Sequence, residues 1–224
     1  LSATMPFTAK AQDKVEASVG ADFVSNYIWR GTDCGGVSIQ PSMGVSYKGL
    51  SLAAWGSVGI DKEDAREIDL TLGYNTGGFN VSVTDYWFSY HKEDGGYTGD
   101  YFKYGAHSTI HIFEATLGYD FGPLALSWNT YFAGDDYTKE NGDRAYSTYV
   151  GISAPFKLGG LDWSAEVGLT PWEGAYANKF NVTNLTLKAE KEIKFTNSFS
   201  LPTFAQVTFN PHTQGAYFVF GVSL

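Results

Sequence analysis

The stretch Leu161–Thr170 reads LDWSAEVGLT, and its side chains alternate between apolar and polar along its whole length. Leu50–Ile60 and Glu67–Tyr74 show the same period of two. Because successive side chains of a β-strand point to opposite faces, each segment has one apolar and one polar face. The pattern therefore predicts strands of a sheet whose two faces differ in chemistry.

Segments of this kind recur along the chain. They cover residues 13–30, 36–48, 50–60, 65–76, 78–90, 107–120, 123–133, 143–155, 160–170, 177–190, 198–209 and 214–224. Many have about the ten residues that a tilted strand needs to cross a bilayer. Tight connections such as Asn75–Gly78 alternate with long polar ones such as Lys92–Ala106, which is typical of outer-membrane barrels. We therefore expect an all-β fold, a transmembrane antiparallel up-and-down β-barrel of about 12 strands.

The polar faces of the segments carry ionisable side chains repeatedly. These are Glu16, Asp22, Glu67, Asp69, Glu114, Asp162, Glu166, Lys188 and Glu190. A dry core does not hold so many unpaired charges, whereas a water-filled lumen does. Tyr74 and Trp163 stand near segment ends, where they suit an interfacial girdle. These features favour a membrane barrel over a soluble β-sandwich or lipocalin-like barrel, which alternation alone does not exclude.

The first residues suggest export. Ala9-Lys10-Ala11 fits the small-x-small pattern of a signal-peptidase site. Residues 1–12 are therefore either a signal-peptide remnant or a flexible N-terminal extension, and residues 13–224 form the barrel. The expected location is the outer membrane of a Gram-negative bacterium.

Composition limits the partners. The net charge is -9, so no basic surface is available for nucleic acid. The single cysteine, Cys34, excludes an internal disulfide. We expect no cofactor, no metal site and no catalytic residues. The expected partners are the lipid bilayer with its lipopolysaccharide, small solutes or ions, and a protein partner of the long loops.

One segment carries a family resemblance. Residues 21–31 read ADFVSNYIWRG and resemble the TorF family of porins, which opens with a segment like Ser-Asp-Tyr-Val-Phe-Arg-Gly. Ser25, Tyr27, Arg30 and Gly31 match that segment, whereas Asn26, Ile28 and Trp29 depart from it. The likeness spans roughly residues 15–135. It implies an outer-membrane barrel and leaves the substrate undefined.

The inward parity of the segments predicts the lumen lining. The expected lining residues are Glu16, Asp22, Arg30, Trp55, Glu67, Asp69, Glu114, Tyr131, Tyr149, Asp162, Glu166, Lys188 and Glu190. Arg30 and Lys188 share this parity, so that they can pair with Asp22, Glu67 or Glu190. The excess of carboxylates favours cations.

Two functions fit such a lumen. The first is a narrow, cation-preferring, porin-like channel for passive diffusion of ions or small polar solutes. The alternative is a closed-lumen barrel that acts as a structural or partner-binding outer-membrane protein through its extracellular loops. Both stay open at this point.

Two residues interrupt the simple pattern. Asp85 shares the apolar parity of Val81 and Val83, which predicts a bulge there or a position at the water interface. His111 is the only histidine well inside a segment, and it has outward parity. Because no base, nucleophile and orienting group are fixed together around His111, we do not expect an enzyme.

Overall fold

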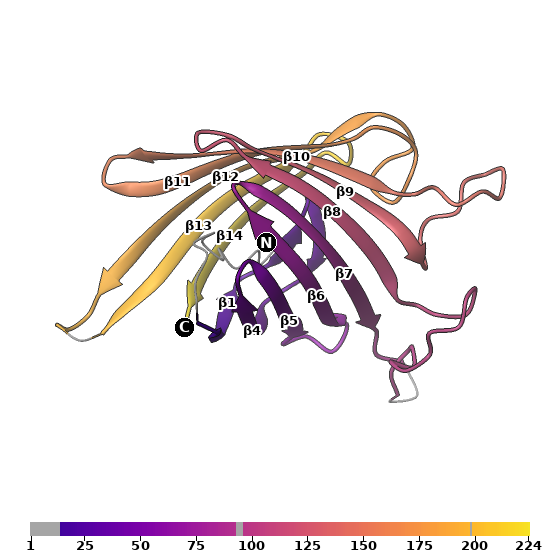
Figure 1. Ribbon diagram of the computed structural model, residues 1–224, viewed down its shortest axis with the longest axis horizontal. Coiled ribbons are helices and arrows are strands. Elements are labelled where there is room, and N and C mark those ends of the chain that lie inside the picture. The colour runs from indigo at the N-terminus through magenta and orange to yellow at the C-terminus, as the bar shows by residue number, and fades with distance from the viewer. Residues whose placement is uncertain (1–13, 93–95, 198) are drawn as a thin grey trace.

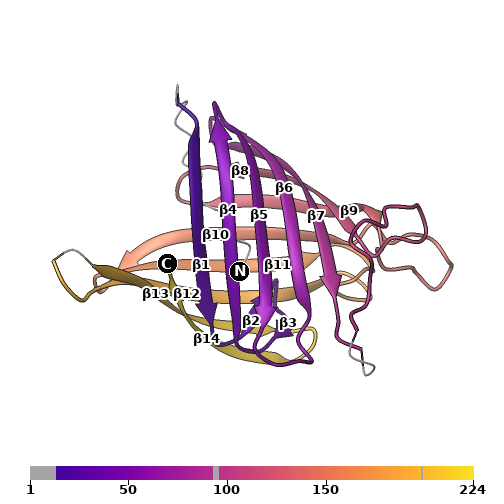
Figure 2. The same ribbon diagram turned by 90° about the horizontal axis from the view of Figure 1, so that it is seen from below.

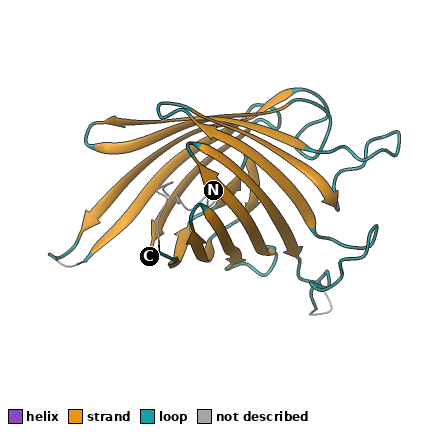
Figure 3. Cartoon of the chain, in the orientation of Figure 1, coloured by secondary structure: helices purple, strands orange, loops and turns teal. Residues whose placement is uncertain are grey.

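The computed structural model describes residues 14–92, 96–197 and 199–224, and the regular elements it assigns there are β-strands (Figure 3). Among these residues, no helix is long and apolar enough to cross a membrane. The prediction for residues 1–12 falls outside the described residues. The strands are β1 (Glu16–Val24), β2 (Tyr27–Trp29), β3 (Thr32–Gly35), β4 (Ser38–Tyr47), β5 (Leu50–Gly59), β6 (Arg66–Thr76), β7 (Phe79–Ser89), β8 (Ile112–Asp120), β9 (Ala125–Gly134), β10 (Thr148–Leu158), β11 (Leu161–Thr170), β12 (Asn181–Lys194), β13 (Ser200–Asn210) and β14 (Gly215–Ser223).

All strands except β2 and β3 form one closed antiparallel barrel (Figure 1). Each barrel strand pairs with the next one along the chain, and β1 closes the ring by pairing with both β14 and β4. Closure removes the unpaired sheet edges that an open sheet would expose. The predicted all-β, up-and-down barrel of 12 strands is confirmed.

The two ends of the barrel differ. Short turns at residues 48–49, 77–78, 121–124, 159–160 and 195–199 lie at one end, which we call the turn end. The connections 25–37, 60–65, 90–111, 135–147, 171–180 and 211–214 lie at the other, which we call the loop end. The start of β1 and the end of β14 lie at the turn end, as an even strand number requires.

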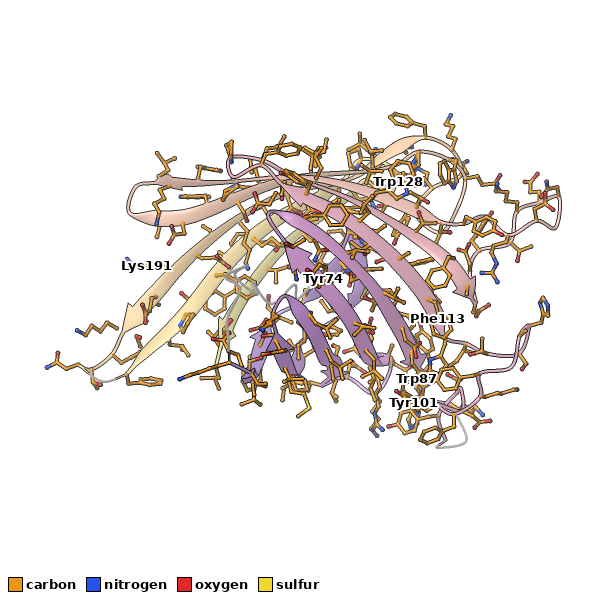
Figure 4. All side chains as sticks on the ribbon, in the orientation of Figure 1. Tyr74, Trp87, Tyr101, Phe113, Trp128 and Lys191 are labelled. Atoms are coloured by element: carbon orange, nitrogen blue, oxygen red, sulfur yellow. The ribbon has the colours of Figure 1, made fainter. Side chains whose placement is uncertain are left out.

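The wall has a polar inner face and an apolar outer face. In β6, Glu67 and Asp69 are buried inside, whereas Ile68, Leu70 and Leu72 are exposed outside. Other strands repeat this order, with polar residues such as Ser, Thr, Asn and Gln among the buried ones. A water-soluble barrel buries its apolar face instead. Figure 4 shows Tyr74 and Trp128 on the outside of this wall, where both are exposed.

The first predicted strand is shorter than expected. Residues 13–30 were predicted as one segment, but β1 ends at Val24 and the chain then turns into the β2–β3 hairpin. Arg30 and Gly31 form the tip of that hairpin with φ angles of 50° and 79°. The prediction is wrong there because alternation continues across Tyr27–Trp29 although those residues leave the barrel wall.

Candidate functional site: the first loop inside the barrel

The first loop, residues 25–37, folds into the barrel. Figure 2 shows its β2–β3 hairpin beside the loop-end portions of β4 and β5. Tyr27 packs against Trp55 on β5, with ring centroids 5.5 Å apart, and the Gly31 carbonyl accepts a 3.0 Å hydrogen bond from Asn210 Nδ2 on β13. Arg30 meets Glu114 on β8. The hairpin therefore contacts walls on different sides of the lumen.

Arg30 and Glu114 form a buried, two-point ion pair. Arg30 Nη1 lies 2.5 Å from Glu114 Oε2, and Nη2 donates to Oε1 at 2.9 Å. The two side chains are only 6% and 2% exposed. Tyr86 also donates to Glu114 Oε1, at 2.9 Å. Such fork-shaped, charge-assisted bonds fix the position of the hairpin tip more firmly than a single contact does.

The predicted partners of Arg30 were wrong. Strand parity offered Asp22, Glu67 or Glu190, whereas the structure pairs Arg30 with Glu114. The physical reason is that Arg30 lies at the tip of the β2–β3 hairpin. Arg30 does not sit on a wall strand, so its reach is set by the loop that carries it across the lumen.

Aromatic rings surround the guanidinium group of Arg30. Its central carbon lies 4.3 Å from the Trp29 ring centroid, 4.7 Å from that of Tyr149 and 5.7 Å from that of Tyr176. These distances are within the range of cation–π attraction. Tyr86, Tyr131, Tyr149 and Tyr176 form one buried cluster, which we call the tyrosine cluster.

Tyr176 connects the ion pair to the rest of the tyrosine cluster. Its hydroxyl accepts from Arg30 Nη1 at 2.5 Å and donates to the Tyr131 hydroxyl at 3.1 Å. Burial raises the pKa of the Tyr176 phenol to about 12, although Arg30 acts in the opposite direction. Tyr176 therefore remains neutral and keeps the proton that it donates.

The tip of the hairpin also has a close steric fit. A Cβ added at Gly31 would lie 1.9 Å from the Thr183 carbonyl oxygen. Thr183 is the extra residue where the β11–β12 register shifts after Gly168. Ile28 is buried with Val24, Phe204 and Val219. The hairpin is thus held by apolar contacts at its base and by backbone contact at its tip.

A second group of predicted lining residues lies under β2. Glu67 and Asp69 are buried on β6, at 5% and 9% exposure, and lie two residues apart on the lumen face of the same strand. Tyr27 packs against Trp55, and Trp55 is the cross-strand neighbour of Asp69. No Lys or Arg among the described residues forms an ion pair with either carboxylate.

The remaining predicted lining residues are spread along the barrel. Glu166 accepts from the Tyr149 hydroxyl at 2.5 Å and from Asn184 Nδ2 at 3.1 Å. Lys188 pairs with Glu190 at 2.5 Å, which is one of the pairings that parity offered. The structure does not bring Glu16, Asp22 and Asp162 to the hairpin: Glu16 and Asp162 are exposed on β1 and β11, and Asp22 is half-buried on β1.

Sequence reasoning missed part of this site. Tyr176 comes from the loop 171–180, and no periodic signal places a loop residue inside a barrel. Tyr86 has the inward parity of Ser82 and Thr84, which was a usable signal. The sequence identified Gly31 only as part of the segment that resembles the TorF family, and did not predict its contact with the barrel wall. Its role depends on a carbonyl group more than a hundred residues away along the chain.

The described parts of the third loop, residues 90–92 and 96–111, pack on the outside of the wall. The Tyr101 ring contacts the Trp87 ring edge-on, with ring centroids 5.4 Å apart, and the ring centroids of Tyr104 and His111 are 4.2 Å apart. Figure 4 shows Trp87, Tyr101 and Phe113 close together at the loop end. The first loop therefore enters the lumen, whereas the third lies against the outer face.

This loop accounts for the carboxylate on the apolar face. β7 pairs regularly on both sides at Asp85, so no bulge interrupts its ladder there. Instead, Asp85 Oδ1 lies 2.6 Å from His111 Nδ1, and His111 Nε2 lies 2.7 Å from the Tyr101 carbonyl. The Tyr101 carbonyl accepts, so His111 Nε2 donates to it, and Nδ1 faces the Asp85 carboxyl group. Both ring nitrogens of His111, at 0% exposure, are therefore engaged within the protein.

Within the described parts of the chain, no group of three or more His, Cys, Asp or Glu side chains is arranged to hold a metal ion. No protein-family model and no curated protein matches the chain. The resemblance to the TorF family therefore stays a prediction.

Proposed function

We propose that the protein is an outer-membrane channel of a Gram-negative bacterium, through which small cations and small polar solutes diffuse past the first-loop hairpin. The observation that carries this proposal is the inversion of the wall. Apolar side chains such as Leu72, Val83 and Phe218 are exposed on the outside, while polar ones are buried inside. Hydrocarbon is the environment in which that outer face is stable, and a polar lumen is what such barrels enclose.

The charge of the lumen supports a preference for cations. Arg30 is neutralised by Glu114, and Lys188 by Glu190. Glu67, Asp69 and Glu166 remain without an ion pair to any described Lys or Arg. Carboxylates that line a narrow passage attract cations and repel anions. The field in the passage therefore has one sign.

Small side chains leave the lumen more open near its turn end. Gly44, Ser46, Gly118 and Ser127 lie in the turn-end halves of β4, β8 and β9 and are only half-buried. Toward the loop end, the hairpin and the tyrosine cluster lie inside the barrel. Because outer-membrane barrels have their short turns in the periplasm, the proposed passage is open toward the periplasm and narrowed toward the outside.

A closed-lumen barrel is the second candidate, and the buried Arg30–Glu114 pair favours it. In that case the protein works through its loops, on lipopolysaccharide or a protein partner. Resemblance to the TorF porins agrees with the channel.

Planar-bilayer recordings of folded, heat-modifiable protein test the proposal. In a KCl gradient, we expect stable conductance, with a reversal potential shifted toward the equilibrium potential of K⁺. The Glu67→Gln/Asp69→Asn variant should shift that potential toward zero, whereas the exposed Asp162→Asn control should not. Anion preference would contradict the acidic lumen. If neither the wild type nor the Arg30→Ala variant conducts, the result would favour the closed barrel.

A further inference from the structure

The carboxyl groups of Glu67 and Asp69 pose an electrostatic problem. Both are more than nine-tenths buried and lie side by side on one strand, two residues apart. When either carboxyl group is ionised, a negative charge lies inside the barrel wall. Burying a charge without a partner is costly, so buried charges are paired or coordinate a cation. None of the ion pairs among the described residues involves Glu67 or Asp69.

Two buried oxygen atoms at this place lack hydrogen bonds within the described structure. They are Asp69 Oδ1 and Gln40 Oε1, and Gln40 is only 1% exposed. Gln40 uses its Nε2 to donate to Ser38 Oγ at 3.2 Å, which leaves its amide oxygen unused. Buried polar atoms are nearly always paired, so unpaired ones mark a position where a ligand is expected.

The barrel register brings these groups together on the lumen face. Asp22 on β1 is the cross-strand neighbour of Gln40 on β4, and Ser57 on β5 is that of Glu67 on β6. Because Ile39 pairs with Val58, Gln40 and Ser57 lie beside each other on adjacent strands. Neighbouring strands are about 4.8 Å apart. Gln40 and Glu67 therefore face the lumen at one level, with Asp69 one step toward the turn end.

The hairpin covers this level from the loop end. Tyr27 is buried, and its ring packs against Trp55, which is the cross-strand neighbour of Asp69. An ion at the carboxyl pair would thus be enclosed by β4, β5, β6 and the hairpin.

We propose that Glu67, Asp69 and the amide oxygen of Gln40 form a binding site for a hard metal cation inside the barrel. All three supply oxygen ligands, which hard cations such as Na⁺ and Ca²⁺ prefer. Only two ligands are charged, so the affinity is weak, with a dissociation constant for Ca²⁺ of about 1 mM. Weak binding suits an ion that enters and leaves a passage. The site rests on the proposed channel function and names the position at which a cation pauses.

Terbium luminescence tests the site directly. Tb³⁺ replaces Ca²⁺ at oxygen sites and emits when a nearby aromatic residue is excited, and Trp55 and Tyr27 are adjacent. We expect sensitised emission from the wild type in detergent, displaced by excess CaCl₂. Asp69→Asn and Gln40→Leu should raise the half-saturating Tb³⁺ concentration about tenfold or more, since each removes an oxygen ligand or its charge.

Glu166→Gln is the matched control. It removes a lumen carboxylate whose oxygen already accepts from Tyr149 and Asn184. It should leave the Tb³⁺ titration unchanged, and heat-modifiability on gels should show that every variant is folded. Equal titration curves for Asp69→Asn and the wild type would overturn the site, because the carboxyl pair then holds protons in place of a metal ion.

The two proposals fail separately. A cation-selective conductance without a Tb³⁺ effect of Asp69→Asn would leave the channel standing and remove the site. A Tb³⁺ signal lost in Asp69→Asn, in a protein that never conducts, would keep the site and remove the channel.

Discussion

Arg30 on the first loop and Glu114 on β8 are 84 residues apart in sequence, yet their side chains make a two-point ion pair 2.5 Å and 2.9 Å long. The pair joins the inward hairpin to the barrel wall. Because both groups are buried, each is stable only in the presence of the other.

Arg30→Met is therefore expected to lower the free energy of unfolding by about 3–5 kcal/mol, because Glu114 is left buried without a counter-charge. Glu114→Gln should have a similar cost, and the double variant should lose less than the sum of the two. Urea titration in detergent, followed by tryptophan fluorescence, measures this. Lys188→Met is the control: its Glu190 partner is half-exposed, so about 0–1 kcal/mol is expected. Strictly additive losses would show that the pair is not coupled.

Gly31→Ala should disturb the packing of the hairpin tip against the barrel wall and so destabilise the protein. Its φ of 79° is costly for any residue with a Cβ, and that Cβ would collide with the Thr183 carbonyl oxygen. Gly122→Ala offers a matched comparison, because Gly122 has φ of 93° with no atom within 4 Å of the added Cβ. We expect a loss of about 1–2 kcal/mol at Gly122 and a larger one at Gly31, measured by the same urea titration. Equal losses would mean that the contact with Thr183 does not matter.

The lipid-facing wall predicts depth-dependent costs. Leu72 lies in the middle of β6 and Leu50 lies at the turn end of β5, and both are exposed on the outer face. For folding into phospholipid vesicles, we expect Leu72→Arg to cost about 2–4 kcal/mol and Leu50→Arg about 0–1 kcal/mol. A barrel that folds equally well with either substitution, or that stays folded and monodisperse in buffer without detergent, would contradict the membrane assignment.

Cys34 on β3 reports the position of the hairpin. Burial, with a further contribution from Glu67, raises the pKa of its thiol to about 12. The thiolate is the reactive form, so at pH 8 the folded protein should react with maleimide on the order of 1000-fold more slowly than an ordinary thiol. The rate should rise with pH up to the raised pKa. Chain unfolded in urea gives the reference rate, and Cys34 is the only cysteine, so labelling has one source.

The same measurement links the thiol to the ion pair. If Arg30 holds the hairpin in the lumen, Arg30→Ala should speed labelling of Cys34 in the folded barrel. Wild-type protein that labels as fast as the unfolded chain would place the hairpin outside the lumen.

The sequence by itself determined the strands and their faces. The alternation in Glu67–Tyr74 is a local consequence of extended backbone geometry, so it predicted which side chains of β6 point inward and which outward. The turn positions followed from the same local pattern. The prediction erred at residues 25–30, because alternation is identical in a wall strand and in a hairpin inside the barrel. It also began the segments 107–120, 143–155 and 177–190 four or five residues before β8, β10 and β12.

Only the tertiary structure decided what fills the lumen. Arg30 meets Glu114, Gly31 meets Thr183 and Tyr176 joins the tyrosine cluster because the closed ring brings distant strands within reach of one loop. Parity gives the side of the wall on which a residue lies, but not the direction in which a loop folds. That direction depends on burial and pairing across the whole barrel, which a period of two does not contain.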